Sequence, residues 1–311
     1  MKVILVGGNG FIGKNLVYKL RKKNIECCVF DRFIESFPFS NVSIIKGELS
    51  DTHILKSIIS NGDKVVHLAW NSVPILSGQA MFNDIQQNIF MSAQLFNICK
   101  ECLAERVIFI SSGGTVYGKP KYLPIDELHP MNPNSSYGVT KVCVEKYLSL
   151  FTQKSKMRGI SLRLSNPYGT WQKPFIGQGV VATYLASAMI ERPIEIWGDG
   201  FAQRDYVYID DACDAIIKTL FYEGNESVIN IGSNIGNSIN DIANSVESIS
   251  GKKIERIYKE ESHVEVNANI LDCRLANQEL AWSASTSLKE GISNMLNCWD
   301  AKECAFQHQI T

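Results

Sequence analysis

Short runs of apolar residues recur along the first half of the chain, and most of them are separated by stretches long enough for a helix. The first run, Val3 to Val6, is apolar at all four positions and is stopped by glycines. A strand that is apolar throughout is typical of a parallel sheet covered on both faces. The segment Phe11 to Lys23 then predicts a helix. Further strands are predicted at Cys27–Phe30, Val42–Ile45, Val65–Leu68, Val107–Ile110 and Ile160–Leu164.

This alternation of strands and helices predicts an α/β fold, a doubly wound parallel sheet of the Rossmann type with right-handed crossovers. After about Asn166 the pattern changes to loops, turn clusters and short mixed elements, which predict a smaller, mixed α/β substrate domain. We expect residues 1–165 to form the dinucleotide-binding domain, with 204–232 returning to it. Residues 166–203 and 233–311 are expected to form the substrate-binding domain.

The composition excludes several classes of protein. The 311 residues carry 31 Lys and Arg against 32 Asp and Glu, a formal charge of −1, so the cationic excess that drives nucleic-acid binding is missing. Apolar runs are too short for a membrane span, and Gly7 interrupts the N-terminal run too early for a signal peptide. Nine cysteines, two of them adjacent, favour a reducing compartment. We therefore expect a soluble cytoplasmic protein with no nucleic-acid or membrane partner.

A glycine-rich loop lies between the first predicted strand and the first predicted helix. Its glycines permit a tight turn and the close approach of a ligand, and the helix N-terminus offers free N–H groups to a pyrophosphate. A turn that binds nothing is the alternative, and the strand–helix context speaks against it. The candidate cofactor residues in this loop are Gly7, Gly10, Phe11, Ile12 and Gly13.

The residues after the second predicted strand bear on the choice of dinucleotide. Asp31 stands about twenty residues beyond the glycine loop, where a carboxylate accepts hydrogen bonds from the adenosine ribose and repels a 2′-phosphate. This favours NAD over NADP. The neighbouring Arg32 argues the other way if its guanidinium pairs with that phosphate; alternatively, it is a solvated surface residue.

Tyr137 and Lys141 have the Tyr-x-x-x-Lys spacing, which places the phenol and the ammonium on one face of a helix. Two other matches begin at Tyr18 and Tyr117, so the spacing alone is weak. A proline interrupts the match at Tyr117, and Tyr18 lies deep in the first helix, away from the cofactor end. Only Tyr137 follows a helix-start pattern, Pro133 to Ser136, after the fifth strand.

Charge arithmetic suggests how such a phenol becomes a base. Ionisation near neutral pH requires its pKa to fall by about 3 units, or roughly 4 kcal/mol. A lysine ammonium about 6 Å away supplies about 3 kcal/mol at an effective dielectric constant near 20. We therefore expect Lys141 to lower the pKa of Tyr137, with a second positive charge, such as an oxidised nicotinamide, supplying the remainder.

The segment Ser111 to Gly118 follows the fifth strand at its carboxyl end, where open α/β sheets bind ligands, and its hydroxyls could hold a substrate oxygen. Together these elements resemble the extended short-chain dehydrogenase/reductase family, in particular its nucleotide-sugar epimerase/dehydratase branch. The ordered matches span nearly the whole chain: the glycine loop, Asp31, Val65–Ala69, Asn88, Ser111–Gly118, Tyr137 with Lys141, Asn166–Gly169 and Arg204–Asp211.

The resemblance assigns roles to these positions. It implies that Tyr137 is the acid/base and that Lys141 holds the nicotinamide ribose and lowers the phenol pKa. It implies diphosphate contacts for Asn166 and Arg204, and cofactor contacts for Leu68, Ala69 and Asn88. The family's usual active-site Ser or Thr falls on Gly113, so the hydroxyl role passes to Ser112 or Thr115, and the sequence does not choose between them.

The same segment favours one reaction over others. Dehydratases of this branch carry Thr-Asp-Glu where this chain has Gly113-Gly114-Thr115, and the decarboxylases and the C3/C5 epimerase-reductases carry Glu or Cys at the position of Thr115. We therefore expect an NAD-dependent 4-epimerase of a nucleoside-diphosphate sugar. The alternatives are an NAD(P)H-dependent reductase of a nucleotide-linked 4-keto-6-deoxy sugar and a non-catalytic dinucleotide sensor, against which the Tyr/Lys pair argues. His67 is expected in the core, and no metal site is expected.

We expect a homodimer, because apolar residues on a predicted helix are available to contact a second subunit. The predicted helix that carries Tyr137 and Lys141 also has an apolar stripe. Its members are Val139, Val142, Cys143 and Leu150, and their helical spacing places them partly outside the face that carries the Tyr/Lys pair. The resemblance implies pairing through the helices at about 81–102 and 136–151 of each subunit, in a four-helix bundle. The alternative is that the stripe packs within its own domain.

Overall fold

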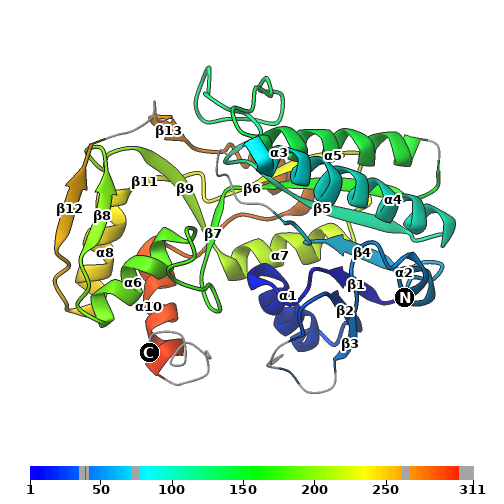
Figure 1. Ribbon diagram of the computed structural model, residues 1–311, viewed down its shortest axis with the longest axis horizontal. Helices are drawn as coiled ribbons and strands as arrows, with labels where there is room; N and C mark the ends of the chain where they lie inside the picture. Colours follow the sequence, from blue (N-terminus) through cyan, green and yellow to red (C-terminus); the bar gives the residue numbers. More distant parts are fainter. Residues whose placement is uncertain (35–38, 40–41, 72–77, 154, 261–265, 301–311) are drawn as a thin grey trace.

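A seven-stranded parallel sheet forms the larger part of the computed structural model, which describes residues 1–34, 39, 42–71, 78–153, 155–260 and 266–300 (Figure 1). Its strand order is β10-β6-β5-β4-β1-β2-β3. The predicted doubly wound sheet is confirmed. The strands are β1 Val3–Val6, β2 Cys27–Asp31, β3 Ser43–Lys46, β4 Lys64–His67, β5 Arg106–Ser112, β6 Arg158–Leu164 and β10 Val228–Ile231.

Helices cover both faces of this sheet. Successive side chains of β1 point to opposite faces, so Val3 and Leu5 enter one core and Ile4 and Val6 enter the other. This double burial explains why β1 is apolar at every position. The first core is completed by α1 Phe11–Lys22 and α7 Ile209–Leu220, and the second by α2 Thr52–Ile58, α4 Met91–Glu101 and α5 Ser136–Gln153.

The strand order reverses between β1 and β4, which is where open α/β sheets bind ligands. The main chains meet closely here, because the N–H groups of Leu68 and Ala69 both donate to the Val6 carbonyl, at 2.8 and 2.9 Å. Gly7 has φ of +83°, and a Cβ at this position would lie 2.4 Å from the Ala69 nitrogen. Only glycine fits at this point of the loop.

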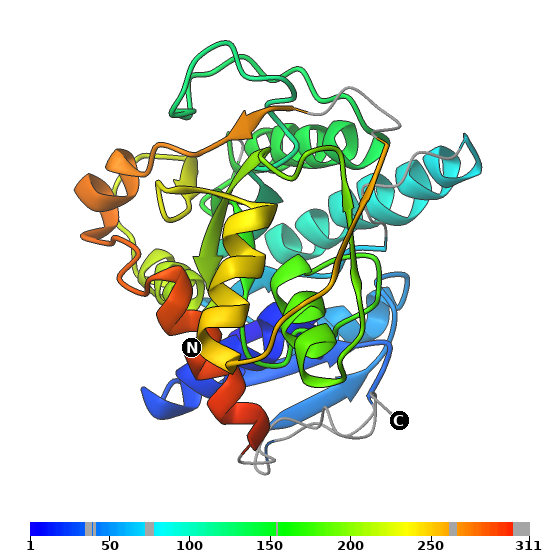
Figure 2. The same cartoon turned by 90° about the vertical axis from the view of Figure 1, so that its left-hand side faces the viewer.

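The remaining elements form a second region, which faces the viewer in Figure 2. Helices α6 and α10 both pack on α8, which crosses the centre of that view. A four-stranded sheet is built around β9, and a separate pair consists of β8 and β12. The bounds are β7 Asn166–Tyr168, β8 Ile194–Trp197, β9 Gln203–Tyr208, β11 Gly236–Ser238, β12 Arg256–Lys259, β13 Ala268–Asn269, α6 Val180–Met189, α8 Ile239–Ser250, α9 Arg274–Leu280 and α10 Leu288–Asp300.

The segment 204–232 is divided between the two regions. Strand β10 joins the large sheet beside β6 and α7 packs on α1, whereas β9 pairs with β7, β11 and β13 of the smaller sheet. The domain boundaries themselves stay a prediction, and their last part, 301–311, lies outside the described residues. None of the helices in the described ranges is long and apolar enough to cross a membrane.

Candidate active site

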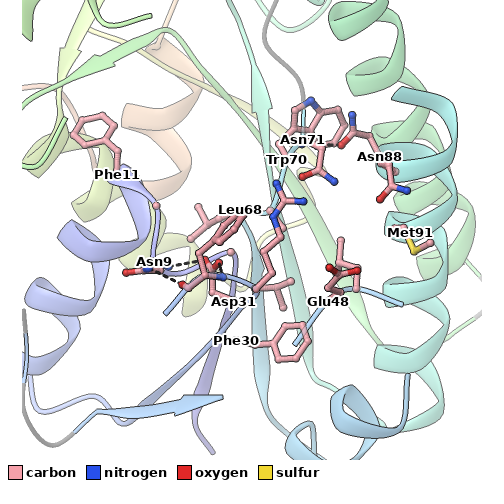
Figure 3. Close-up of a pocket in the computed structure, with 18 of the residues that line it drawn as sticks. Asn9, Phe11, Phe30, Asp31, Glu48, Leu68, Trp70, Asn71, Asn88 and Met91 are labelled. Carbon is pink, nitrogen blue, oxygen red and sulfur yellow. Dashed lines mark hydrogen bonds between the residues drawn. The ribbon is translucent and has the colours of Figure 1, made fainter. Parts of the chain in front are cut away.

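A cavity of about 860 Å³ lies at the carboxyl ends of β1, β2 and β4, beside the glycine loop. Figure 3 shows Asn9 and Asp31 in this cavity, with Trp70, Asn71 and Asn88 grouped at another part of its wall. Eight of the residues proposed from sequence to contact the cofactor line it. They are Gly7, Gly10, Phe11, Asp31, Arg32, Leu68, Ala69 and Asn88.

Two further loop residues do not line the cavity. Ile12 is partly buried and packs against the core that also contains Leu16 and Val17 of α1. Gly13 is buried, and a Cβ there would lie 2.4 Å from the Gly8 carbonyl oxygen, so glycine is needed for the close packing of helix on loop. Their contribution to a cofactor site is therefore the shape of the loop.

The start of α1 suits an anion. Gly10 is the N-cap residue and offers no side-chain cap, and the first turn contains no acidic residue. A Cβ on Gly10 would meet nothing closer than the Gly7 carbonyl oxygen at 3.5 Å, so the backbone is open to a ligand. Uncapped N–H groups at the positive end of a helix fit a pyrophosphate.

Asp31 is held in place by the main chain. Its carboxylate accepts hydrogen bonds from the N–H groups of Asn9 and Phe33, at 2.9 and 3.0 Å (Figure 3 shows the group beside Asn9). A carboxylate oriented in this way keeps lone pairs for ribose hydroxyls. The neighbouring Arg32 is exposed and lies over the Phe33 ring, 4.8 Å from its centroid.

Two lysines that the sequence analysis did not single out also line the cavity. Lys14, in the first turn of α1, is half-buried, and burial together with the nearby Lys173 lowers its pKa. Within the described residues neither lysine forms an ion pair. A cation in the first turn opposes the helix dipole, and a second cation beside it adds repulsion. Both costs are offset if a diphosphate lies between them.

Lys173 belongs to a loop between β7 and α6 that covers one side of the cavity, far in sequence from the glycine loop. This loop also contributes Trp171, Gln172, Ile176 and Gln178. Glu48 and Leu49, which follow β3, line the opposite part. The position of Glu48 and Leu49 at a strand's carboxyl end could have indicated them, whereas nothing in the sequence connects the β7–α6 loop to the glycine loop.

Asn88 lies in a π-helix, η1 Ile85–Phe90, which follows α3 Gly78–Asp84. Its side chain accepts the Asn71 N–H at 3.0 Å and donates to Asp84 at 3.2 Å, and the Ser136 hydroxyl donates to the same carboxylate at 2.6 Å. Asn88 thus ties the segment after β4 to the start of α5. Short π-helical segments are frequent at functional sites.

Tyr137 and Lys141 lie one turn apart on α5, next to the end of β5. The Ser135 hydroxyl accepts the Gly138 N–H at 3.2 Å and caps this helix start. The Tyr137 hydroxyl is hydrogen-bonded to the Ser112 side chain, and Lys141 Nζ donates to the Ile110 carbonyl at 2.8 Å. Of the two hydroxyls left open by the sequence, Ser112 is the one in contact with Tyr137.

Thr115, the other candidate hydroxyl, is half-buried, and its buried Oγ1 has no partner among the described residues. Gly113 shows why this chain departs from the usual Ser or Thr. A Cβ on Gly113 would lie 2.5 Å from Leu271 Cδ1, so that side chain fills the space. Gly114 is open, and a Cβ there would meet only Ser112 Oγ at 3.8 Å and Asn166 Oδ1 at 3.9 Å.

That Lys141 and an oxidised nicotinamide together lower the phenol pKa stays a prediction; in the protein on its own, the pKa of Tyr137 is shifted upward. Burial raises the pKa of Tyr137 to about 12, although the hydrogen bond from Ser112 opposes the change. Burial also lowers the pKa of Lys141 to about 7, against the opposing charge of Glu145. Desolvation penalises the charged forms of both groups, an effect that charge attraction alone does not include.

The residues expected at the substrate diphosphate lie outside the cofactor cavity, on adjacent strands β7 and β9. Asn166 Nδ2 donates to the Asp205 carbonyl at 2.8 Å, which leaves Oδ1 facing the space above Gly114. Arg204 Nη1 donates to the Val266 carbonyl at 2.7 Å. The structure therefore brings Asn166 to the Ser112–Tyr137 cluster and places Arg204 on the neighbouring strand.

His67 packs in the core, as predicted. Its Nε2 lies 2.8 Å from the Ser92 hydroxyl, and burial, with a contribution from Lys141, lowers its pKa to about 3. In the described part of the chain, no group of three or more His, Cys, Asp or Glu side chains is placed to hold a metal ion.

A model of the NAD-dependent epimerase/dehydratase family matches residues 3–232. The chain belongs to this family. The resemblance to the extended short-chain dehydrogenase/reductases is thereby confirmed, and so are its enzymatic nature and the assignment of NAD as cofactor.

Named members of the NAD-dependent epimerase/dehydratase family match over nearly the full length. An Escherichia coli protein named dTDP-4-dehydro-6-deoxyglucose reductase is 33% identical, covering 94% of this chain and 96% of the relative. A putative UDP-glucose 4-epimerase of Methanocaldococcus jannaschii is 30% identical, covering 95% and 97%. The crystal structure of a Thermotoga maritima UDP-glucose 4-epimerase with UDP-glucose superposes with a TM-score of 0.90 at 29% identity, covering 97% and 99%.

Proposed function

We propose that this enzyme is a 4-epimerase of a nucleoside-diphosphate sugar. The observation that carries the proposal is the contact of Tyr137 with Ser112 beside the open backbone of Gly114. A sugar hydroxyl can approach the phenol there, and the segment Ser111–Gly118 contains no carboxylate to eliminate water. The site thus has the groups for proton transfer at a secondary alcohol and lacks those of the dehydratases.

The residues of the cavity fit NAD. The N–H groups in the first turn of α1 suit the diphosphate, as do Lys14 and Lys173, which form no ion pair in the described part of the chain, and Asp31 suits the adenosine ribose. When bound, NAD would supply a reversible hydride acceptor beside the sugar, so that an inversion would involve no net oxidation.

The chain's own groups handle the proton. Tyr137 takes the proton of the sugar 4-hydroxyl at its phenolic oxygen and later returns it, and Ser112 stabilises the phenolate by donating a hydrogen bond. Lys141 supplies positive charge from one turn away, and the family resemblance assigns it to the nicotinamide ribose. Asn166 and Arg204 hold the substrate diphosphate, and a free diphosphate end lets the keto sugar turn between the two transfers.

A reductase of a nucleotide-linked 4-keto-6-deoxy sugar is the second candidate. The observation that favours it is the 33% identity to the Escherichia coli reductase. The same residues would serve, but reduced cofactor would be consumed. The sensor hypothesis is not retained, because the family and its named relatives are enzymes.

One assay separates the two candidates. Purified protein is incubated without added cofactor with UDP-glucose, UDP-N-acetylglucosamine, dTDP-glucose and GDP-mannose, and the sugars are followed by NMR. Inversion at C4 with catalytic turnover supports the epimerase. If nothing reacts until NADH and a 4-keto sugar nucleotide are supplied, the reductase takes its place.

We also propose that the enzyme works as a homodimer through helices α3 to α5. Large apolar side chains are exposed along them: Phe82, Ile85, Phe90, Val139, Tyr147 and Leu150. Of the predicted stripe, Val142 is partly buried against its own chain, at the cluster of Val116, Tyr117, Ile125 and Leu271. Light scattering should show a dimer that Leu150→Glu converts to monomer, and a wild-type monomer at micromolar concentration would contradict the proposal.

A further inference from the structure

Trp70 stands between the cofactor cavity and the acid/base pair. It follows β4 and lines the cavity, whereas Tyr137 and Lys141 do not (Figure 3 shows Trp70 at the cavity wall). Its ring lies edge-on to Tyr137, with the centroids 6.0 Å apart and the planes at 74°. Lys141 Nζ lies only 3.6 Å from the centroid of the Trp70 ring. One side chain therefore contacts both members of the pair.

The surroundings of Lys141 offer little else to a cation. The Ile110 carbonyl accepts one hydrogen bond at 2.8 Å, and the ring centroids of Phe109 and Tyr137 lie 4.8 and 5.5 Å away. Within the described residues no carboxylate lies within ion-pair distance of Lys141. The ammonium is almost fully buried, with 4% of the residue exposed, so its charge is balanced by one carbonyl and by aromatic faces.

Titratable groups approach Lys141 from two elements. On α5 these are Tyr137 itself and Glu145, one turn farther along, whose carboxylate is held by Arg163 of β6 at 2.7 Å and by the Ser111 hydroxyl. On β4 the neighbour is His67, which burial keeps neutral near physiological pH. Since Glu145 is committed to Arg163, the indole face is the nearest electron-rich group besides the Ile110 carbonyl.

We propose that Trp70 is a positioning residue of the active site, whose indole face holds the Lys141 ammonium against the Ile110 carbonyl and toward Tyr137. An aromatic face attracts a cation most strongly where water is excluded, and tryptophan does so better than tyrosine or phenylalanine. An aliphatic side chain of similar volume would fill the space without this attraction. The proposal rests on the proposed function, since it assigns Trp70 to the pair that is to move the proton.

The experiment compares Trp70→Leu, Trp70→Phe and Trp70→Tyr with the wild type, without cofactor. Lysine labelled with ¹³C at Cε is followed by NMR over pH, and the Lys141 signal is identified by its loss in Lys141→Met. We expect the Lys141 pKa to fall by about one unit in Trp70→Leu and by less in the two aromatic variants. Trp171→Leu, which removes an indole from another part of the cavity wall, is the matched control and should leave this pKa unchanged.

A turnover series then tests the role in the reaction. In Trp70→Leu, the limb of the pH profile that reflects loss of the Lys141 proton should move to lower pH, and kcat should fall about tenfold or more. In Trp70→Phe, the position of this limb and the value of kcat should both lie close to those of the wild type. Equal behaviour of Trp70→Leu and Trp70→Phe would overturn the proposal, since the indole would then only fill volume. If Trp70→Leu does not fold, the two aromatic variants still test the proposal. The Lys141 pKa should then be higher in the wild type than in Trp70→Tyr and Trp70→Phe, and equal values in all three would contradict the proposal.

The role of Trp70 and the proposed epimerase function would be refuted by different measurements. The Lys141 pKa is measured in the protein without cofactor or substrate and does not depend on which reaction is catalysed. An unchanged pKa in all three variants would refute the role of Trp70 and leave the epimerase proposal standing. Conversely, full turnover of Tyr137→Phe would refute the proposed function, whereas the shift caused by Trp70→Leu would still be observed.

Discussion

The cofactor cavity and the acid/base pair lie next to each other, yet they differ in how far their charges are prepared for a ligand. In the cavity, Asp31 is oriented by two main-chain N–H groups, and the start of α1 is open. Around the pair, burial raises the pKa of Tyr137 to about 12 and lowers that of Lys141 to about 7. The cavity is thus ready to bind, whereas burial penalises the charged forms of the pair.

This difference suggests a division of work between protein and cofactor. Desolvation makes the phenolate and the ammonium costly, but it also strengthens any charge interaction that a ligand brings. A positively charged nicotinamide placed near Tyr137 would favour the phenolate. The enzyme would then acquire its base only when the oxidised cofactor is bound.

The largest expected effect is on turnover in Tyr137→Phe. Because only the proton-transferring oxygen is removed, kcat should fall by about 10²- to 10⁴-fold. NAD affinity, measured by calorimetry, should stay near the wild-type value, since Tyr137 does not line the cavity. Tyr18→Phe, in a helix with the same Tyr-x-x-x-Lys spacing, is the control and should change neither quantity. Turnover of Tyr137→Phe within about tenfold of wild type would contradict the assignment.

The next effect is on stability and its pH dependence. In the unfolded chain Lys141 keeps its proton up to about pH 10.5, whereas in the folded protein its pKa is about 7. Between these values the unfolded state binds more protons, so the free energy of unfolding should rise with pH, by about 1.4 kcal/mol per unit from this group. Denaturant unfolding of the protein without cofactor at about pH 7 and about pH 9 measures this slope.

Lys141→Met should lack that slope and should be more stable than wild type near pH 7, because a buried, weakly compensated charge is removed. Lys64 is the matched control, since it is also 4% exposed but pairs with Glu105 at 2.8 Å and the Leu220 carbonyl at 2.6 Å. Lys64→Met should destabilise the protein. Equal destabilisation by both substitutions would mean that Lys141 is as well compensated as Lys64.

A smaller effect is expected when two adjacent glycines, Gly113 and Gly114, are each replaced by alanine. Gly113→Ala should cost about 1–3 kcal/mol of unfolding free energy, because its Cβ would collide with the fully buried Leu271. Gly114→Ala should leave stability within about 0.5 kcal/mol, since nothing lies closer than 3.8 Å, but should lower kcat/KM by occupying the space beside Ser112 and Asn166. If both variants lose stability equally, the space above Gly114 is not free.

The smallest effect concerns cofactor choice. Asp31→Ala should weaken NAD about tenfold, near 1.4 kcal/mol, and NADP less, because the ribose acceptor and the repelling charge are lost together. Titration of each variant with both dinucleotides measures the ratio. If the wild type already prefers NADP, Arg32 rather than Asp31 determines the choice.

Local patterns were enough to predict much of the fold and of the cavity. The apolar runs located β1, β2, β5 and β6, and the glycine loop located the cavity, because these features depend on residues close in sequence. The contact of Leu271 with Gly113, and the approach of the β7–α6 loop to the glycine loop, join distant residues and left no local pattern.

Burial explains where the structure differs from a reading of single elements. The upward shift of the Tyr137 pKa in the protein on its own could not be predicted, because the extent of desolvation depends on neighbours such as Trp70, which come from another element. Val142, assigned to an external stripe, is partly buried against a cluster that includes Ile125 and Leu271, and the helix pattern alone cannot show this contact.

The dependence of the acid/base pair on the cofactor's charge is tested most directly by the ionisation of Tyr137. Tyrosinate absorbance is titrated with pH for the protein alone, with NAD⁺ and with NADH, and the same titrations of Tyr137→Phe are subtracted to remove the other tyrosines. The account predicts no ionisation of Tyr137 below about pH 10 in the protein alone or with NADH, and a pKa lower by about two units or more with NAD⁺. Ionisation near neutral pH without cofactor, or the same titration with NAD⁺ as with NADH, would contradict it.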